Sequence, residues 1–212
     1  MDWEERSVAI DGQAGTGKST LAKMLGARLG LDHLDTGATY RSLALIGIHD
    51  KVDLDDPKAL VAAFNRHHLE LGDARVILDG SDVTNEIRHP AISDAASRVA
   101  TLHPVRQVLV AFQRNFVKEH NGAVAEGRDV GTVVLTRARL KVFLKADDEV
   151  RRNRRGDTPR DELEQRDFRD ANREVNPLAV APGAVVIDTS ERNIAELVAE
   201  MEGLYYLGLP ES

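Results

Sequence analysis

The sequence predicts an α/β fold in which a parallel sheet is covered by helices on both faces. Short apolar segments, typical of buried strands, alternate along most of the chain with segments of helical periodicity. A glycine-rich loop lies between the first of these strands and the first helix. One stretch in the first half of the chain breaks the alternation with short strands and turns. We therefore expect one α/β core that carries a small β-rich insertion.

Five segments have the apolar character of buried strands, namely residues 7–11, 32–34, 123–126, 140–144 and 184–188. The clearest helical pattern follows the last strand, and one apolar face of it comprises Ile194, Leu197, Val198, Met201, Leu204 and Tyr205. Ser190 has the side chain expected to cap the start of that helix. A chain of 212 residues suits a single unit, residues 1–212, with small excursions.

The predicted insertion covers about residues 52–100, which leaves about residues 1–51 and 101–212 for the core. The most charged stretch lies later, at residues 151–173, and contains eight arginines and six acidic residues. This balance fits a solvated helix pair with ion pairs between neighbouring turns. Beside a phosphate-binding loop it also fits a mobile lid, over about residues 150–168, whose arginines close over phosphates.

Composition bears on compartment and partners. The chain has no cysteine, so it has no disulfide, thiolate metal site or cysteine nucleophile, which fits a reducing cytoplasm. Its net charge of −7 argues against general nucleic-acid binding. The acidic N-terminus does not fit a signal peptide, and no apolar run approaches the ~20 residues of a membrane span. We expect a cytoplasmic monomer with small-molecule substrates and with no nucleic-acid or membrane partner.

The glycine-rich loop fits the phosphate-binding pattern G-x-x-x-x-G-K-[ST], here as Gly12-Gln13-Ala14-Gly15-Thr16-Gly17-Lys18-Ser19. Its glycines let successive backbone N–H groups turn inward around a phosphate, and the following helix adds the partial positive charge of its N-terminus. Lys18 can reach the β- and γ-phosphates of a nucleoside triphosphate, and the Ser19 hydroxyl can ligate Mg²⁺. The loop therefore predicts a nucleoside triphosphate site.

Other patterns narrow the class of P-loop protein. A signalling GTPase needs N-K-x-D and D-x-x-G sequences, and the chain contains neither. Motor and transport ATPases are usually longer, and the segment that imitates their acidic strand end, residues 185–188, lies very late in the chain. A kinase for a small metabolite fits better. A kinase for AMP, dTMP or a non-nucleotide hydroxyl, and a nucleotide sensor without activity, stay open as alternatives.

Three polar constellations favour a phosphorylated acceptor. Tyr40 and Arg41 follow the second strand, at the edge where such sheets bind ligands, and offer a ring face and a planar fork for phosphate. Arg128 and Asp129 stand between two glycines after the third strand, where they can read a polar ligand edge. The third constellation, on one helical face, is Arg166, Asp170 and Arg173. It suits a phosphate and a sugar hydroxyl, or a ladder of surface ion pairs.

These residues give the chain a resemblance to the bacterial cytidylate (CMP) kinases over almost its whole length. The matching segments include Ile10-Asp11-Gly12, Leu34-Asp35-Thr36-Gly37-Ala38, Tyr40-Arg41, Glu86-Ile87-Arg88, Ala96-Ser97, Val105-Arg106, Glu126-Gly127-Arg128-Asp129-Val130-Gly131-Thr132 and Arg166-Asp167, with Arg169-Asp170 and Asn172-Arg173. The resemblance implies a five-stranded parallel P-loop kinase core, a monophosphate-binding insertion and a short helical lid. It implies direct transfer of the γ-phosphoryl group of ATP to CMP or dCMP, with Mg²⁺ as cofactor.

The resemblance also assigns roles to residues. ATP would be bound by the loop residues 12–19 together with Thr20, Arg154 and Arg155, and Ser19 would hold Mg²⁺, with Asp35 ordering its water molecules. CMP would be bound by Thr36, Tyr40, Arg41, Ser97, Arg106, Arg128, Asp129, Arg166 and Asp170. Within that set, Ser97, Arg106 and Asp129 would read the base, Arg41 and Arg128 the phosphate, and Arg166 and Asp170 the sugar. Phosphoryl transfer would depend on Lys18, Arg128 and Arg173.

The chemistry of the base agrees with that assignment. Cytosine presents an exocyclic amino group to a carboxylate such as Asp129, and its N3 and O2 atoms accept from an arginine such as Arg106. Uracil would reverse these contacts and leave buried polar groups without partners. A good bidentate contact is worth roughly 1–3 kcal/mol of discrimination, so CMP should be preferred to UMP by one to several decades.

Overall fold

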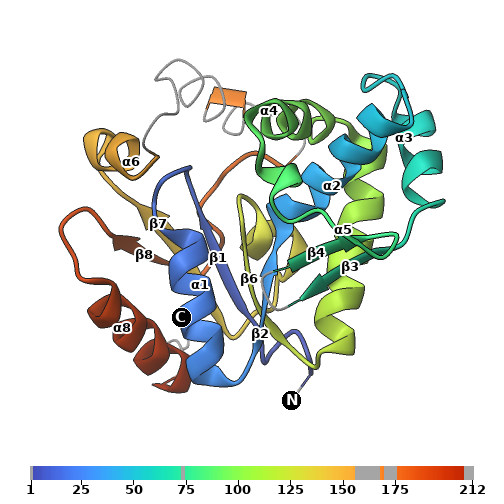
Figure 1. The fold of residues 1–212 in the computed structure, drawn as a ribbon. Helices are drawn as coiled ribbons and strands as arrows, with labels where there is room; N and C mark the ends of the chain where they lie inside the picture. The colour runs from blue at the N-terminus through green and yellow to red at the C-terminus, as the bar shows by residue number, and fades with distance from the viewer. Residues whose placement is uncertain (1, 73–74, 156–167, 170–175, 208–212) are drawn as a thin grey trace.

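The computed structural model describes residues 2–72, 75–155, 168–169 and 176–207. Its centre is a five-stranded sheet in the order β2-β6-β1-β7-β8 (Figure 1), and all four neighbouring pairs are parallel. The strands are β1 (Val8–Gly12), β2 (Asp32–Asp35), β6 (Ala123–Gly127), β7 (Leu140–Lys145) and β8 (Val185–Asp188). The predicted parallel sheet is confirmed, and each expected strand agrees with the observed one to within a residue at either end.

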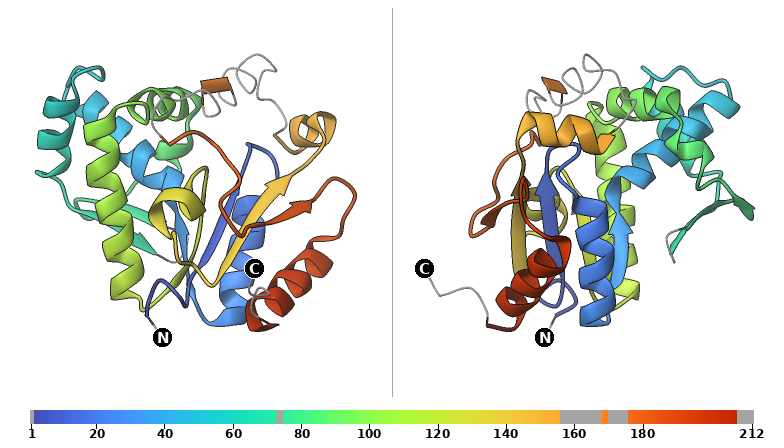
Figure 2. Two further views of the ribbon diagram at one scale, coloured as in Figure 1. Left: turned by 180° about the vertical axis from the view of Figure 1, so that it is seen from behind. Right: turned by 60° about the vertical axis from the view of Figure 1, so that its left-hand side comes forward.

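Helices cover both faces of the sheet, as the two views in Figure 2 show. Because successive side chains of a strand point to opposite faces of the sheet, Ile10 of β1 belongs to the core on one face and Ala9 to the core on the other. The Ile10 face packs against Leu25 and Met201, and the Ala9 face packs against Val117 and Val130. The helical segments concerned are α1 (Lys18–Leu29) and α8 (Ile194–Leu207) on the first face, and α5 (His103–Glu119) and the π-helical turn η2 (Val130–Val134) on the second. The site is therefore built on a sheet buried from both sides.

Helix α8 begins later than its sequence suggests. The side chain of Asn193 accepts a hydrogen bond from the backbone N–H of Ala195 at 2.7 Å, so Asn193 caps the helix. Ser190, the expected cap, instead donates its hydroxyl to the Asp188 carboxylate at 2.7 Å and accepts from the backbone N–H of Asp147 at 2.9 Å. Ser190 therefore fixes the turn after β8, and the prediction that it caps α8 was wrong.

The segment between α2 (Thr36–His49) and α5 packs with these two helices around one hydrophobic core. Its three-stranded antiparallel sheet has the order β3-β4-β5, which confirms the expected β-structure, and helices accompany it. Leu60, Ile87 and Val99 are fully buried in this core. The elements are α3 (Pro57–Phe64), β3 (Leu69–Gly72), β4 (Arg75–Leu78), β5 (Ser81–Asp82), the 3₁₀ turn η1 (Glu86–Arg88) and α4 (Pro90–Val99). Below, the insertion means residues 52–100.

Helix α6 (Asp148–Arg155) follows β7 and lies against the phosphate-binding loop. Arg151 donates from Nη1 to the carbonyl oxygen of Ala14 at 3.1 Å and from Nη2 to Asp148 at 2.6 Å. A Cβ atom at Gly15 would lie 2.6 Å from the carbonyl oxygen of Arg151, so this contact requires a glycine. The rest of the expected lid, residues 156–167, lies outside the described residues. Among the helices that are described, none is both long and apolar enough to cross a membrane.

Candidate active site

The phosphate-binding loop connects β1 to α1 and already has the conformation of a phosphate cradle. Gly15 and Gly17 have positive φ angles of 79° and 91°, which glycine adopts without strain. A Cβ at Gly12 would lie 2.3 Å from the carbonyl oxygen of Leu144, so the chain can turn out of the sheet only with glycine there. Lys18 is buried, and its Nζ donates to the carbonyl oxygen of Gln13 at 2.7 Å. The predicted loop residues thus form one structural unit.

Two pockets flank this loop, and Lys18 and Ser19 line both of them. The first pocket, of ≈ 390 Å³, lies toward α2, β6 and the insertion, and we call it the acceptor pocket. The second, of ≈ 480 Å³, lies toward α6 and the start of α8, and we call it the donor pocket. A lysine shared by two adjoining pockets is the arrangement needed to act on a phosphoryl group that moves between two bound molecules.

The donor pocket is lined by the loop together with Thr20, Arg154, Thr189, Ile194 and others. Arg154 of α6 donates to the hydroxyl of Thr189 at 3.0 Å and to its carbonyl oxygen at 2.6 Å. The Thr189 hydroxyl in turn donates to the carbonyl oxygen of Thr16 at 3.0 Å. Arg154 therefore joins α6, the end of β8 and the loop at one pocket. The side chain of Arg155, predicted beside it, lies outside the described residues.

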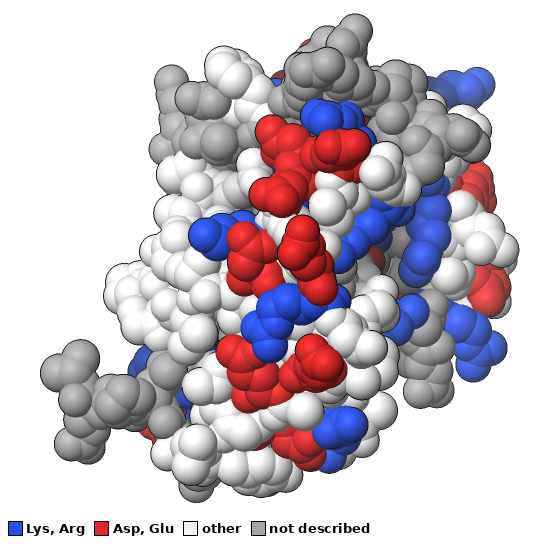
Figure 3. Space-filling view, turned by 90° about the vertical axis from the view of Figure 1, so that its left-hand side faces the viewer, with Lys and Arg blue, Asp and Glu red and all other residues white. Residues whose placement is uncertain are grey.

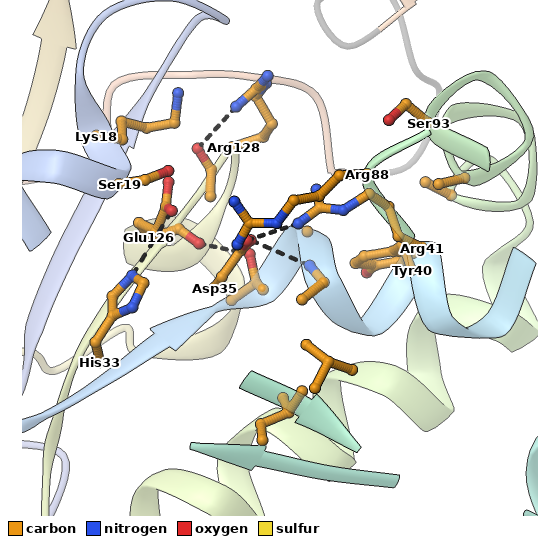
Figure 4. Close-up of a pocket in the computed structure, with 18 of the residues that line it drawn as sticks. Lys18, Ser19, His33, Asp35, Tyr40, Arg41, Arg88, Ser93, Glu126 and Arg128 are labelled. Carbon is orange, nitrogen blue, oxygen red and sulfur yellow. Dashed lines mark hydrogen bonds and ion pairs between the residues drawn. The ribbon is translucent and has the colours of Figure 1, made fainter. Parts of the chain in front are cut away.

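One end of the acceptor pocket is formed where β2 runs into α2 (Figure 4). Asp35 caps α2 by accepting from the backbone N–H of Ala38 at 3.1 Å, and Arg41, six residues later, donates to Asp35 at 2.6 Å. Burial alone would raise the pKa of Asp35, but the charges of Arg41 and His33 outweigh it and hold that pKa below its usual value. Asp35 thus stays a carboxylate and orients Arg41, whose buried Nε atom has no hydrogen-bond partner among the described residues.

The opposite end of the acceptor pocket contains a buried ion pair between Arg106 of α5 and Asp129, which follows β6. Arg106 is 2% exposed, donates to the carbonyl oxygen of Ala100 at 3.3 Å and lies 5.5 Å from the centre of the Tyr40 ring. The hydroxyl of Ser97, also in this pocket, is buried and has no hydrogen-bond partner in the part of the chain that the structure describes. Three polar side chains from distant parts of the sequence therefore meet at this pocket.

Asp11, at the end of β1, is a residue of this site that sequence reasoning left without a role. Its two carboxylate oxygens accept from the backbone N–H groups of Val130 and Gly131, at 2.7 and 2.8 Å. These bonds hold the segment directly after Asp129 against the start of the phosphate-binding loop. Burial, reinforced by the charge of Asp129, raises the pKa of Asp11 to about 6, against the opposing effects of the two hydrogen bonds and of Lys18.

The pKa of Asp11 predicts a specific pH dependence of stability. Because the folded-state pKa of about 6 exceeds the ordinary aspartate value of 3.8, the native state binds more protons than the unfolded state between these two pH values. The carboxyl group therefore adds stability as the pH falls through 6, by up to about 3 kcal/mol. Asn at this position cannot titrate. We expect the difference in unfolding free energy between wild type and Asp11→Asn to shift in favour of wild type from pH 7 to pH 4; a constant difference would refute this.

Glu126, at the end of β6, is a second residue of the pocket without an assigned role in the sequence analysis. Within the described residues, one oxygen of its buried carboxylate has no hydrogen-bond partner, and His33 Nε2 lies 3.7 Å from it. Its backbone carbonyl accepts from the hydroxyl of Thr36 at 2.7 Å, which fixes the start of α2 beside it. Its position at the end of an apolar strand, just before a glycine, is the sequence pattern that could have indicated a role for Glu126 in the site.

The charges that line the acceptor pocket differ in sign from the whole molecule. Six cationic side chains face three carboxylates; the cations are Lys18, Lys23, Arg41, Arg75, Arg88 and Arg128, and the carboxylates are Asp35, Glu126 and Asp129. Figure 3 shows acidic and basic side chains interspersed on the face that it displays. Two glutamates of α8 take part in the ion pairs Arg28–Glu202 and Arg192–Glu200. The pocket therefore attracts an anion locally although the protein carries a net charge of −7.

The predicted site residues that the structure describes gather around these two pockets. Thr36, Tyr40, Arg41, Ser97, Arg128 and Asp129 line the acceptor pocket, and Arg106 pairs with Asp129 behind it. Thr20 and Arg154 line the donor pocket. Arg166, Asp170 and Arg173 lie outside the described residues, so the predicted contacts to sugar and transferring phosphate stay predictions.

Comparison with known proteins gives the family. The family model for cytidylate kinase matches residues 8–205. The chain belongs to the cytidylate kinase family. Among curated relatives, the cytidylate kinase of Desulforamulus reducens is 43% identical over 210 residues, which cover 92% of this chain and 94% of the relative. That of Caldicellulosiruptor saccharolyticus is 38% identical over 216 residues, with 94% and 95% covered. The resemblance inferred from the sequence is confirmed, and the chain is a nucleoside monophosphate kinase of the family that phosphorylates CMP and dCMP with ATP.

Solved structures agree on the fold of this cytidylate kinase family member. A gluconokinase from Sinorhizobium meliloti has a TM-score of 0.50 at 15% identity, with 95% of this chain and 93% of the other covered. A protein from Eubacterium ventriosum has a TM-score of 0.51 at 12% identity, with 94% and 97% covered. At such identities the likeness concerns the fold alone.

Proposed function

We propose that this chain transfers the γ-phosphoryl group of ATP to CMP or dCMP, with ATP in the donor pocket and the monophosphate in the acceptor pocket. The observation that carries the proposal is the buried Arg106–Asp129 pair beside the unpartnered Ser97 hydroxyl. A carboxylate and an arginine side by side offer an acceptor for the cytosine amino group and donors for its ring N3 and O2 atoms. Uracil matches neither contact.

In this proposal the reaction needs no covalent intermediate and no strong base, because the acceptor oxygen belongs to a phosphate that is already anionic. Catalysis is then positioning together with stabilisation of charge. Arg41, oriented by Asp35, and Arg128 hold the acceptor's phosphate, and Lys18 lies between the two pockets. Lys18, Arg128 and Arg173 would spread the charge that develops on the transferring group. Arg166 and Asp170 would bind the sugar.

The residues around Lys18 fit a Mg²⁺ ion bound with ATP. Ser19 lines both pockets and would supply its hydroxyl as a ligand. The unpartnered oxygen of Glu126 and the carboxylate of Asp35 lie in the acceptor pocket, and both are the hard oxygen groups that order the water shell of Mg²⁺. When bound, such an ion neutralises charge on the β- and γ-phosphates.

The proposal also assigns roles to the insertion and the lid, and it includes the compartment and the oligomeric state. The insertion would bind the monophosphate, about residues 150–168 would form the lid, and closure of both would exclude water from the reacting groups. The enzyme would act in the cytoplasm as a monomer on small molecules. The gathering of Arg41, Ser97 and Arg128 at one pocket supports the assignment of the insertion, because Ser97 belongs to it and the two arginines do not.

The proposal is tested by measuring ADP release from ATP and Mg²⁺ with and without CMP. We expect release to depend on CMP and to yield CDP in equal amount. ATP binding without CMP-dependent release would contradict the proposal and favour a nucleotide sensor.

A further inference from the structure

We propose that Gln113 is a positioning residue of the acceptor pocket, which holds the start of α2, and with it the ring of Tyr40, at a fixed distance from α5. The inference rests on the proposed function and deepens it. Gln113 belongs to α5 and lines neither pocket, so it can act on the acceptor only through its neighbours. The residue is buried, with 1% of its surface exposed. Since a buried amide is costly unless it is hydrogen-bonded, its partners indicate what it does.

The partners of Gln113 belong to the first turn of α2. Its Nε2 donates to the hydroxyl of Thr39 at 2.8 Å and to the carbonyl oxygen of Thr36 at 3.5 Å. The Thr39 hydroxyl donates to that same carbonyl oxygen at 2.7 Å. The Thr36 hydroxyl donates in turn to the carbonyl oxygen of Glu126 at 2.7 Å. One buried chain of hydrogen bonds therefore joins α5 to the start of α2 and to the end of β6.

The same face of α5 carries the arginine that pairs with Asp129. Arg106 and Gln113 are seven residues apart, which is nearly two helical turns, and both contact α2, the helix beside α5 in Figure 1. Tyr40 directly follows Thr39, and the centre of its ring lies 5.5 Å from the guanidinium carbon of Arg106. The Gln113 hydrogen bond and the Arg106–Tyr40 contact therefore link the same two helices. The hydrogen bond sets the spacing at which the arginine and the ring face the acceptor.

Packing alone does not explain an amide at this place. Methionine is unbranched like glutamine, fills irregular spaces well and brings no polar group that must be paired. An apolar contact has no preferred direction, whereas a hydrogen bond keeps its donor and acceptor within a narrow range of distance. A binding site needs its contacting groups held to within about 0.5 Å, and hydrogen bonds from residues behind the site supply that precision. Gln113 supplies it for the ring of Tyr40.

The test separates position from stability by removing both partners of the hydrogen bond. In the full chain, Gln113→Met combined with Thr39→Val replaces both polar groups by apolar ones, so the thermal unfolding midpoint should stay within about 3 °C of wild type. Calorimetric titration should nevertheless show the affinity for CMP falling by roughly 5- to 20-fold, the loss expected when one or two hydrogen bonds to the ligand no longer form well. The affinity for ATP should be unchanged, because neither residue lines the donor pocket.

Two further variants serve as controls. Gln107→Met makes the same substitution at an exposed position of α5 that lines neither pocket, and it should leave both affinities unchanged. Thr39→Ser keeps the hydroxyl that Gln113 contacts and should keep the affinity for CMP, whereas Thr39→Val alone should lower it.

Several results would overturn the role of Gln113. Wild-type affinity for CMP in the double variant would show that the hydrogen bond serves stability alone. Equal losses for CMP and ATP, or equal losses in Thr39→Ser and Thr39→Val, would also contradict it. The wild-type protein tests the proposed function separately. If it releases ADP in response to CMP while the double variant binds CMP normally, only the role of Gln113 fails. If the double variant loses affinity for CMP but the wild type shows no turnover, only the proposed function fails.

Discussion

Replacing Lys18 with methionine should lower kcat for CMP phosphorylation roughly 10²- to 10³-fold, the loss typical of a donor that stabilises a transition state. Lys18 lines both pockets, so its ammonium group is the charge best placed to follow the phosphoryl group from one to the other. Methionine keeps an unbranched, apolar stem in the buried position. Steady-state rates at saturating ATP and CMP measure the effect, and circular dichroism checks the fold.

Lys118→Met provides the matched control for that experiment. Lys118 is exposed near the end of α5 and lines neither pocket, so the same change of charge there should leave kcat unaltered. A Lys18→Met enzyme that keeps more than about a tenth of wild-type kcat would show that charge stabilisation at the junction of the pockets comes from other groups.

Replacing Arg106 with leucine should destabilise the fold by about 3–5 kcal/mol, because it leaves the carboxylate of Asp129 buried without its partner. The neighbouring charge of Asp11 adds to that penalty, since the two carboxylates repel each other. Denaturant unfolding measures the loss. The double variant, with leucine at both positions, should recover much of it, since the unpaired charge is gone. A loss below about 1 kcal/mol for the single variant would mean that Asp129 is solvated or protonated.

The same pair predicts base selectivity. Asp129→Asn keeps the shape of the side chain but replaces one acceptor oxygen by a donor, so an amide can turn to match either pyrimidine. The preference for CMP over UMP, expressed as a ratio of kcat/KM values, should shrink by roughly one to two decades. An unchanged ratio would remove Asp129 from base reading.

Sequence patterns were sufficient for the sheet and the phosphate-binding loop, for a physical reason. Strands β1 and β6 are buried along their whole length and rich in apolar residues, and all five strands were placed to within a residue at either end. The loop is recognisable because its glycines are required locally: Gly12 passes close to Leu144, and Gly15 and Gly17 have positive φ angles. Information of this kind is contained in a few consecutive residues.

Features that depend on contacts between distant segments were not predictable in the same way. Asp11 accepts hydrogen bonds from Val130 and Gly131, which lie 119 and 120 positions later in the chain. The sequence next to Asp11 contains no pattern that predicts these bonds. Glu126 looked like a strand end, and its unpartnered oxygen becomes visible only when β2 lies beside β6. Ser190 is a residue type that often caps helices, but its hydroxyl donates to the Asp188 carboxylate and is therefore not used to cap α8.

The central claim is that the acceptor pocket selects a cytidine monophosphate, and a panel of acceptors tests it most directly. Purified wild-type protein would be assayed for kcat/KM with CMP, dCMP, UMP, AMP and dTMP at saturating ATP and Mg²⁺. The account predicts that CMP and dCMP exceed each of the other three by at least about tenfold, since the Arg106–Asp129 pair leaves mismatched polar groups against any other base edge. UMP or AMP phosphorylated as efficiently as CMP would contradict it.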